Sequence, residues 1–300
     1  MQIYIENIAK DELRSGFIVS SSMKRVWNAQ LNILHEFDRI CKKHGLTYYF
    51  YAGSLLGAAR HSGYIPWDND LDLCMLRPDY AKLTAIIQDE MGEDFYFENY
   101  HNQKNKIYHS QFFLKGTLAS FPGFPLEYLN SLYIDIFPLD FSAWNNPSLS
   151  PDEQIIATKS NNLALYCYGR KAEIDASVFM PAEIDYLNRL DLIELMQLYE
   201  NYLLGHFTIG TDLALHAWQA GAKPEKKSTF TFRRHFFDQM TYLPFETLQV
   251  PVVKDYDAML QCHFGDWHTP VKGSSYHEGA VMSADIDCRE LESYIRGKQG

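Results

Sequence analysis

Hydrophobic and polar residues recur along this chain with two different periods, and the change of period marks its predicted elements. Over residues 24–44 the apolar side chains return every three or four positions, as on one face of a helix, and Gly45 follows as the expected helix end. "LTYYFYAG" (46–53) predicts a strand, and "SLLGAARHSG" (54–63) predicts a short helix opened by Ser54. The pattern therefore predicts helix, strand, tight Gly-Ser turn and helix.

The segments that follow continue this mixture. "DLDLCML" (70–76) predicts a strand, and "DYAKLTAIIQDEM" (79–91) predicts an amphipathic helix. Runs rich in aromatic and β-branched residues predict further strands: "FYFENY" (95–100), "YHSQFFLK" (108–115) and "SLYIDIF" (131–137). The first half of the chain is therefore expected to have an α/β (α+β) fold.

The second half has a different pattern. Pro147 and Pro151 flank a polar linker, and residues from about 151 to 220 are expected to be mostly helical. "FETLQVPVVKDYDAMLQCHFGDW" (245–267) predicts a strand or turn followed by a helix that Gly265 caps, and the last twenty residues look peripheral. We expect residues 1–148 to form a catalytic core, and residues 149–300 to complete the same site as a helical segment or as part of one continuous domain.

Composition restricts the classes of partner. With 46% apolar residues in 300, the chain can bury a substantial core, while 27 basic against 38 acidic residues give a net charge of −11. This charge has the wrong sign for sequence-independent attraction to nucleic acid or to an anionic membrane. No apolar run has the length of a membrane span, and the first residues lack the pattern of a signal peptide. We expect a cytoplasmic protein with no nucleic-acid partner and no integral membrane segment.

The five cysteines are scattered and odd in number, without any C-x-x-C spacing, which favours reduced thiols over a disulfide framework: Cys41, Cys74, Cys167, Cys262 and Cys288. Cys262, Cys288 and the histidines His263, His268 and His277 do not have the spacing of a regular zinc site. The sequence therefore gives little support to structural zinc.

The strongest chemical signal is a set of carboxylates inside apolar strands. Asp70 and Asp72 share one face of the predicted strand, with Cα atoms roughly 6.5 to 7 Å apart, and Asp135 stands alone among apolar residues in "LYIDIF". Isolated carboxylates are costly to bury, and a divalent cation between them removes that cost. Oxygen ligands favour Mg²⁺ or Mn²⁺. We assign Asp70, Asp72 and Asp135 as catalytic and metal-binding residues, with Asp68 and Asp140 as weaker candidates.

A possible anion site precedes these acids. Gly53 lets the backbone approach a phosphate closely, and Ser54 lies where helix N–H groups favour an anion. Phosphate at this turn and metal at the carboxylates together indicate phosphoryl transfer. The structural alternative is that the aspartates cap turns or pair with Arg60, Arg77 or other bases.

These residues carry a resemblance to a known family. Gly53-Ser54, Asp70-x-Asp72 and Asp135 resemble the nucleotidyltransferase fold, and "GSLLGAARHSGYIPWDNDLDL" resembles the LicD family of phosphotransferases. "YIDIFPLD" is similar to the family's third-acid segment, and 245–267 to its C-terminal signature. The sequence departs from the family in having Asn69 where a further Asp is common, and "HFGDW" where an aromatic-Gly-Asp-aromatic-Met run is usual.

The resemblance implies a nucleotidyltransferase-like mixed sheet flanked by helices, and a reaction. Family members transfer phosphocholine or a related phospho-alcohol from a CDP-linked donor to a cell-surface glycan, such as lipopolysaccharide or teichoic acid. The implied partners are a CDP-alcohol and a glycan or glycolipid acceptor, and an acceptor on a lipid carrier would bring the protein to the inner membrane face. On this hypothesis Asp70 and Asp72 bind Mg²⁺ (or Mn²⁺), and Asp135 completes the metal site or takes the proton of the acceptor hydroxyl.

Other residues are candidates for contacts with substrate. They are Arg60 and Lys115 for phosphate, Asp68 beside the main acids, and Trp67 for stacking on a base or caging choline. Each has a structural alternative, in a surface ion pair for Arg60 and in the core for Trp67. A basic cluster formed by Lys226, Lys227, Arg233, Arg234 and His235 either grips an anionic acceptor or lies in a solvated loop.

Two other functions use the same acids. A nucleotidyltransferase would move a nucleoside monophosphate from an NTP and release pyrophosphate. A catalytically silent binding protein on the same fold would not need all the strand acids, which this chain retains. The alcohol, the acceptor glycan and the oligomeric state do not follow from the sequence.

Overall fold

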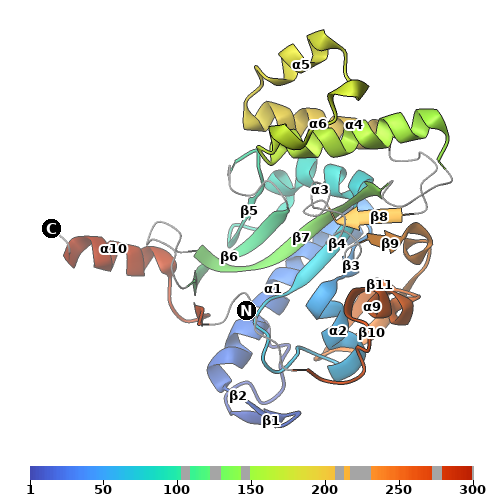
Figure 1. The fold of residues 1–300 in the computed structure, drawn as a ribbon. Helices are drawn as coiled ribbons and strands as arrows, with labels where there is room; N and C mark the ends of the chain where they lie inside the picture. Colours follow the sequence, from blue (N-terminus) through green and yellow to red (C-terminus); the bar gives the residue numbers. More distant parts are fainter. Residues whose placement is uncertain are drawn as a thin grey trace.

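A mixed β-sheet forms the centre of the molecule (Figure 1). The computed structural model describes residues 1–102, 109–121, 130–142, 149–206, 213–216, 231–271 and 279–298. The sheet runs in the order β12, β6, β7, β4, β3, with β5 paired to β6, β8 to β7, and β9 to β8. The pair β4 and β7 is parallel and the other pairs of this sheet are antiparallel, which confirms the expected mixed sheet.

The strands of this sheet are β3 (Tyr49–Phe50), β4 (Asp72–Leu76), β5 (Phe95–Glu98), β6 (Ser110–Ser120), β7 (Asn130–Ser142), β8 (Leu213–His216), β9 (Thr231–Arg233) and β12 (Val281–Ser283). Two hairpins lie outside it, β1 (Glu12–Arg14) with β2 (Phe17–Val19), and β10 (Met240–Phe245) with β11 (Leu248–Val253). The α-helices are α1 (Ser21–His44), α2 (Ala52–His61), α3 (Arg77–Glu90), α4 (Pro151–Cys167), α5 (Pro181–Leu187), α6 (Leu192–His206), α9 (Tyr256–Phe264) and α10 (Cys288–Lys298). None of the helices described is long and apolar enough to cross a membrane.

Helix α1 confirms the prediction made from its apolar period. The Ser20 hydroxyl accepts a hydrogen bond from the N–H of Met23, and Gly45 ends the helix at φ = +62°. Its apolar face packs on β6 and β7, where the rings of Phe37 and Phe112 lie 6.4 Å apart between centroids. This packing covers one face of the sheet with helix.

The next segment differs from the prediction at two boundaries. Helix α2 begins at Ala52 with Tyr51 as its N-cap, so the prediction that Ser54 opens this helix is wrong. The Ser54 hydroxyl instead accepts a hydrogen bond from the backbone N–H of Asp72, at 2.8 Å. Strand β4 also begins only at Asp72, so Asp70 precedes the strand rather than lying in it.

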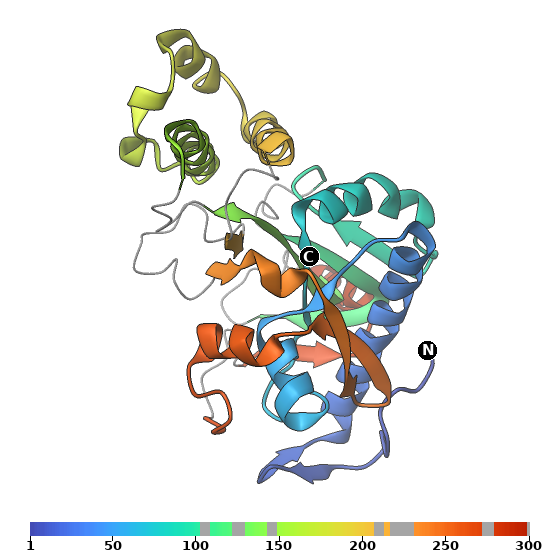
Figure 2. The ribbon, with the colours of Figure 1, turned by 90° about the vertical axis from the view of Figure 1, so that its right-hand side faces the viewer.

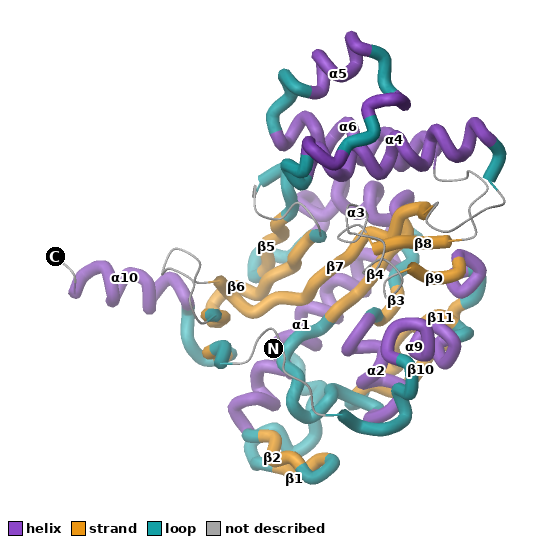
Figure 3. The backbone as a smooth tube through the Cα atoms, viewed as in Figure 1, coloured by secondary structure: helices purple, strands orange, loops and turns teal. Residues whose placement is uncertain are grey.

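Helices α4, α5 and α6 form a unit with an apolar cluster of its own, apart from the main core. Figures 2 and 3 show this unit on one side of the strand-rich body. A capping box between Ser150 and Glu153 starts α4. The expected helical stretch holds from 151 to 206 but not to 220, because residues 213–216 form β8.

The remainder of the second half also contributes strands, which the sequence analysis did not expect. Strands β8, β9 and β12 join the main sheet, so the last residues are less peripheral than predicted. The predicted strand and helix of 245–267 are confirmed as β11 and α9, with Gly265 at the helix end. Strands of three or four residues give too short a pattern to be recognised in sequence.

His263 on α9 gives a prediction for stability. Its ring stacks on Phe264, with centroids 4.2 Å apart, and burial lowers its pKa to about 4. The unfolded chain binds this proton near pH 6.5 and the folded chain near pH 4, so stability is lost as pH falls between these values, by no more than about 3 kcal/mol. Urea unfolding between pH 4 and 7 should be less pH-dependent for His263→Phe than for the parent. An unchanged pH dependence would contradict the burial of a neutral imidazole.

Candidate active site

Three polar side chains lie in one row across three neighbouring strands. Asp72 of β4 is in register with Asp135 of β7, and Asp135 is in register with Gln111 of β6. Residues in register on paired strands project from the same face of a sheet. Leu73, Ile136 and Phe112, next to them in the chain, are fully buried and project to the other face, where α1 packs. The acids therefore lie on the face opposite α1.

Asp68 and Asp70 extend this row beyond the start of β4. Burial raises the pKa of Asp68, and the neighbouring Asp70 carboxyl group raises it further. Burial also raises the pKa of Asp72, and the charges of Asp70, Asp135 and Asp68 raise it further. The charged forms of Asp68 and Asp72 are therefore disfavoured by burial and by the neighbouring acids, and a cation bound nearby would favour them.

Gly53 and Ser54 lie in the first turn of α2 rather than in a tight turn before the helix, and they pack directly against these acids. A Cβ atom on Gly53 would lie 3.0 Å from the Oδ2 atom of Asp68, so glycine allows the close approach of the two segments. Ser54 fixes the first residue of β4 through its bond to the Asp72 N–H. The hydroxyl group accepts in that bond and retains a proton that it can donate. The predicted combination of Gly53, Ser54, Asp70, Asp72 and Asp135 is therefore assembled in one place.

Two residues that the sequence analysis missed hold Asp135. Gln111 donates from Nε2 to Asp135 Oδ1 at 2.7 Å, and His109 Nε2 lies 2.9 Å from the same oxygen. The His109 ring also lies 4.7 Å from that of Phe137 between centroids. The signal was present in "YHSQFF", because polar residues at alternate positions of an aromatic strand point to one face.

Comparison with known proteins agrees with this geometry. Residues 45–161 match the family described as LicD/FKTN/FKRP, nucleotidyltransferase domain, and this stretch contains the Gly-Ser turn and all four acids. This segment of the chain is therefore similar to the nucleotidyltransferase domain of the LicD family.

Individual relatives match over shorter stretches. Lipopolysaccharide cholinephosphotransferase LicD of Haemophilus influenzae is 38% identical over 68 residues, which are 23% of this chain and 26% of the relative. Ribitol 5-phosphate transferase FKRP of Homo sapiens is 44% identical over 48 residues, 16% of this chain and 10% of the relative. An uncharacterised protein of Rickettsia prowazekii is 31% identical over 72 residues, 23% and 27% of the two chains. The match thus spans about a quarter or less of each of these relatives.

Asp68, Asp70, Asp72 and Asp135 form a set of ligands that fits a hard divalent cation. All four groups offer carboxylate oxygens, and Asp68 and Asp70 are close enough for the charge of one to raise the pKa of the other. Within the described residues, however, no three Asp, Glu, His or Cys side chains are close enough to form a complete metal group. The metal at Asp70, Asp72 and Asp135 therefore stays a prediction, and binding would require these carboxylates to move together.

The other residues predicted to contact substrate do not all lie near Asp68, Asp70, Asp72 and Asp135. Arg60 donates from Nη1 to the carbonyl of Trp267 at 2.9 Å, and so joins α2 to the "HFGDW" segment. Trp67 packs its ring edge-to-face with His61, at 6.2 Å between centroids. Lys115 is exposed at the far end of the β5–β6 pairing from Gln111, and its ammonium donates to the Glu93 carbonyl at 2.6 Å.

The remaining candidate residues have structural roles, are exposed, or lie outside the described residues. Arg77 pairs with Asp140 and Glu200, so Asp140 is part of a structural ion pair. Cys288 is buried with its sulfur 3.6 Å from the Ser131 hydroxyl, whereas Cys262 is exposed. No zinc group exists among the described residues, and His277 lies outside them. Lys226 and Lys227 of the basic cluster also lie outside the described residues, and Arg233 and His235 are exposed.

Gln111 offers a test of how Asp135 is positioned. We expect Gln111→Met to lower transfer about tenfold, because a hydrogen bond to a charged group contributes roughly 1.5 kcal/mol or more and the rotation of Asp135 would be less restricted. Gln88→Met, at an exposed glutamine of α3, should leave the rate unchanged. Steady-state kinetics would measure both. A rate for Gln111→Met equal to that of the parent would show that this hydrogen bond does not matter to the reaction.

Proposed function

We propose that this protein transfers phosphocholine, or a related phospho-alcohol, from a CDP-linked donor to a hydroxyl group of a cell-surface glycan and releases CMP. The observation that carries the proposal is the row of Asp72, Asp135 and Gln111, in register on three strands, with the Gly53-Ser54 turn packed against its end. This arrangement combines an anion site with carboxylates, as phosphoryl transfer requires. The names of the relatives, a cholinephosphotransferase and a ribitol 5-phosphate transferase, support the class of reaction.

Each residue has a role in this reaction. The backbone at Gly53, in the first turn of α2, and the hydroxyl of Ser54 bind a phosphate oxygen of the donor. Asp135, oriented by Gln111 and His109, takes the proton of the acceptor hydroxyl. The hydroxyl oxygen bonds to the phosphorus that carries the alcohol, the bond from that phosphorus to the bridging oxygen breaks, and CMP leaves with the bridging oxygen.

Asp70, Asp72 and Asp135 would hold Mg²⁺ or Mn²⁺, which neutralises the phosphate charge of the donor when it is bound. Without that cation, the four carboxyl groups would repel an anionic donor. Donor binding and metal binding should therefore depend on each other.

A thermal-shift panel tests this proposal. The ligands are CDP-choline, CDP-ribitol, CDP-glycerol, CTP and ATP, each with and without Mg²⁺, because a ligand at about 100 times its Kd stabilises the folded state by roughly 2.7 kcal/mol. We expect one CDP-alcohol to stabilise the protein more than CTP does, and only with Mg²⁺. Asp79→Asn, at a carboxylate that pairs with Lys82 on α3, is the control and should respond as the parent does. Stronger stabilisation by CTP or ATP would instead favour nucleotidyl transfer.

A further inference from the structure

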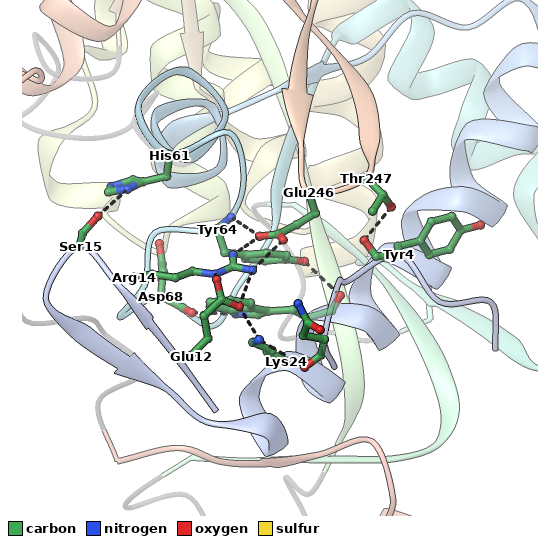
Figure 4. Close-up of polar contacts among 12 residues, drawn as sticks. Tyr4, Glu12, Arg14, Ser15, Lys24, His61, Tyr64, Asp68, Glu246 and Thr247 are labelled. Atoms are coloured by element: carbon green, nitrogen blue, oxygen red, sulfur yellow. Dashed lines mark hydrogen bonds and ion pairs between the residues drawn. The ribbon is translucent and has the colours of Figure 1, made fainter. Parts of the chain in front are cut away.

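A polar cavity of about 410 Å³ lies beside the acid site and has no role in the proposed reaction so far. Residues of the β1–β2 hairpin, the end of α2 and the turn between β10 and β11 line it (Figure 4). Arg14, Ser15, His61, Ser62, Tyr64 and Glu246 are among the lining residues. Its volume is in the range of roughly 300 to 1,000 Å³ that is usual for small-molecule sites.

The charges around this cavity are matched within the protein. Arg14 donates two hydrogen bonds to Glu246, at 2.5 and 3.1 Å, and a third to Glu12 at 3.0 Å. Lys24, which is 0% exposed, forms an ion pair with Glu12. A ligand with a full charge would therefore have to compete with these pairs, and a negative one would also face three lining carboxylates, those of Glu6, Glu12 and Glu246.

The aromatic surfaces nearby are also occupied. The Tyr64 ring stacks on Trp27, with centroids 4.7 Å apart and planes at 2°, and meets the ring of Phe245 edge-to-face. Arg14 lies 5.4 Å from the centre of the Trp27 ring. A quaternary ammonium group such as choline binds to open aromatic faces, which these contacts cover.

The cavity has the chemistry that suits a neutral polyhydroxyl compound. Carboxylate oxygens can accept further hydrogen bonds beyond their ion pairs, and serine hydroxyls donate as well as accept. The Glu246 side chain is held in place, because its carboxylate accepts hydrogen bonds from Arg14 and from the Tyr64 N–H at 3.2 Å. These bonds accompany a backbone conformation of φ = +54°, which is strained for a residue other than glycine. A sugar ring requires both hydrogen-bond donors and hydrogen-bond acceptors in fixed positions.

Tyr64 and Trp27 connect this cavity with the acid site, because Tyr64 lines the cavity and stacks on Trp27. Trp27 donates from its indole N–H to the carbonyl of Asp68 at 3.0 Å. Burial raises the pKa of the Tyr64 phenol, and the charges of Glu246 on the cavity side and of Asp70 and Asp68 on the acid side raise it further. From Pro66 in the cavity wall to Asp70 the chain can extend at most about 14 Å.

We propose that the cavity binds a neutral sugar unit of the acceptor glycan, next to the unit whose hydroxyl is phosphorylated. This inference rests on the proposed function, and it adds that the acceptor is recognised by an uncharged sugar through groups of β1–β2, α2 and the β10–β11 turn. The sugar contributes affinity and does not take part in the chemistry.

Binding of simple sugars tests the cavity without any reaction. The probes are the methyl glycosides of glucose, galactose and N-acetylglucosamine, with inorganic phosphate and choline as charged comparisons, followed by saturation-transfer NMR. Ser62→His narrows the cavity at a position with φ = +52°, which histidine tolerates better than most residues do. Ser15→Asn, at φ = +48°, is a second narrowing variant, and Ser22→His on the exposed surface of α1 is the control.

We expect at least one glycoside to bind the parent, Ser22→His and Asp72→Asn alike, and to bind the two narrowed variants at least tenfold more weakly. In a transfer assay the narrowed variants should raise the KM for the acceptor at least tenfold and leave kcat unchanged. Tighter binding of phosphate or choline than of every glycoside, or an unaltered acceptor KM in both variants, would overturn the inference. Glycoside binding that depends on the cavity, with no transfer from any donor, would instead reject the proposed function and keep the cavity.

Discussion

Asp72→Asn should lower the rate of transfer by a factor on the order of 10³ or more, and at the same time stabilise the ligand-free protein. Asp72 is the carboxylate whose charge three other acids oppose, so its pKa is raised by burial and then by Asp70, Asp135 and Asp68. An asparagine of the same shape removes one charge from this group and keeps the Ser54 bond to the backbone N–H of residue 72. The site thus holds charges that folding alone would not favour.

Asp140→Asn is the matched control for this prediction. Asp140 is also a buried aspartate of a central strand, β7, but its two oxygens accept from Arg77 at 2.6 and 2.7 Å. We expect the Asp140→Asn protein to be less stable than the parent and to keep most of the transfer rate per folded molecule. Chemical unfolding and single-turnover kinetics on the two variants would measure both effects. A destabilised Asp72→Asn protein with full turnover would contradict the assignment of this acid to the reaction.

Arg77→Met should be the most destabilising single change in the ion pairs described here, at about 3 to 5 kcal/mol. The Arg77 side chain is 3% exposed, and it pairs with Asp140, which is 1% exposed, and with Glu200 at 2.6 Å. The Tyr100 hydroxyl donates to the other oxygen of Glu200 at 2.5 Å. Removal of the guanidinium leaves two carboxylates without their base in a site from which water is largely excluded.

The ion pairs of Arg77 join two parts of the molecule, so Arg77→Met should have a second measurable effect. Arg77 begins α3 of the catalytic core, and Glu200 belongs to α6 of the separate helical unit. Hydrogen exchange in α6 should therefore increase more than in α1. The double variant Arg77→Met/Asp140→Leu should recover part of the lost stability, because apolar groups of similar size often replace a buried ion pair without loss. Equal exchange in both helices would contradict a role in fastening the helical unit.

Most of the catalytic core could be predicted from the sequence because the patterns that indicate it are local. The period of α1 and its Gly45 end, the Gly-Ser turn and the acids near β4 and in β7 each depend on a few neighbouring residues. Asp72 and Asp135 are far apart in the chain and in register on paired strands. Their proximity could still be predicted, because charged residues are rare in apolar strands and both aspartates needed a common explanation. The error at Ser54 arose because a serine at a helix start ordinarily caps it, whereas here its hydroxyl bonds to another strand.

Other features depended on contacts between segments far apart in the chain. His109 and Gln111 become important only when β6 lies beside β7, and the strands β8, β9 and β12 are too short to show a period. Arg60 and Lys115 were assigned from their charge and their position in the sequence, but their partners are the carbonyl groups of Trp267 and Glu93. A cationic side chain near a predicted site therefore carries little information until its hydrogen bonds are known.

Turnover in ¹⁸O-labelled water tests the central claim most directly, because slow hydrolysis of the donor needs no glycan. The enzyme, in excess, is incubated with Mg²⁺ and the CDP-alcohol that stabilises it most, and the products are analysed by mass spectrometry. Attack at the phosphorus that carries the alcohol places the label in the phospho-alcohol and leaves CMP unlabelled, which is the predicted result. Label in CMP would show attack at the nucleotide phosphorus and contradict phospho-alcohol transfer.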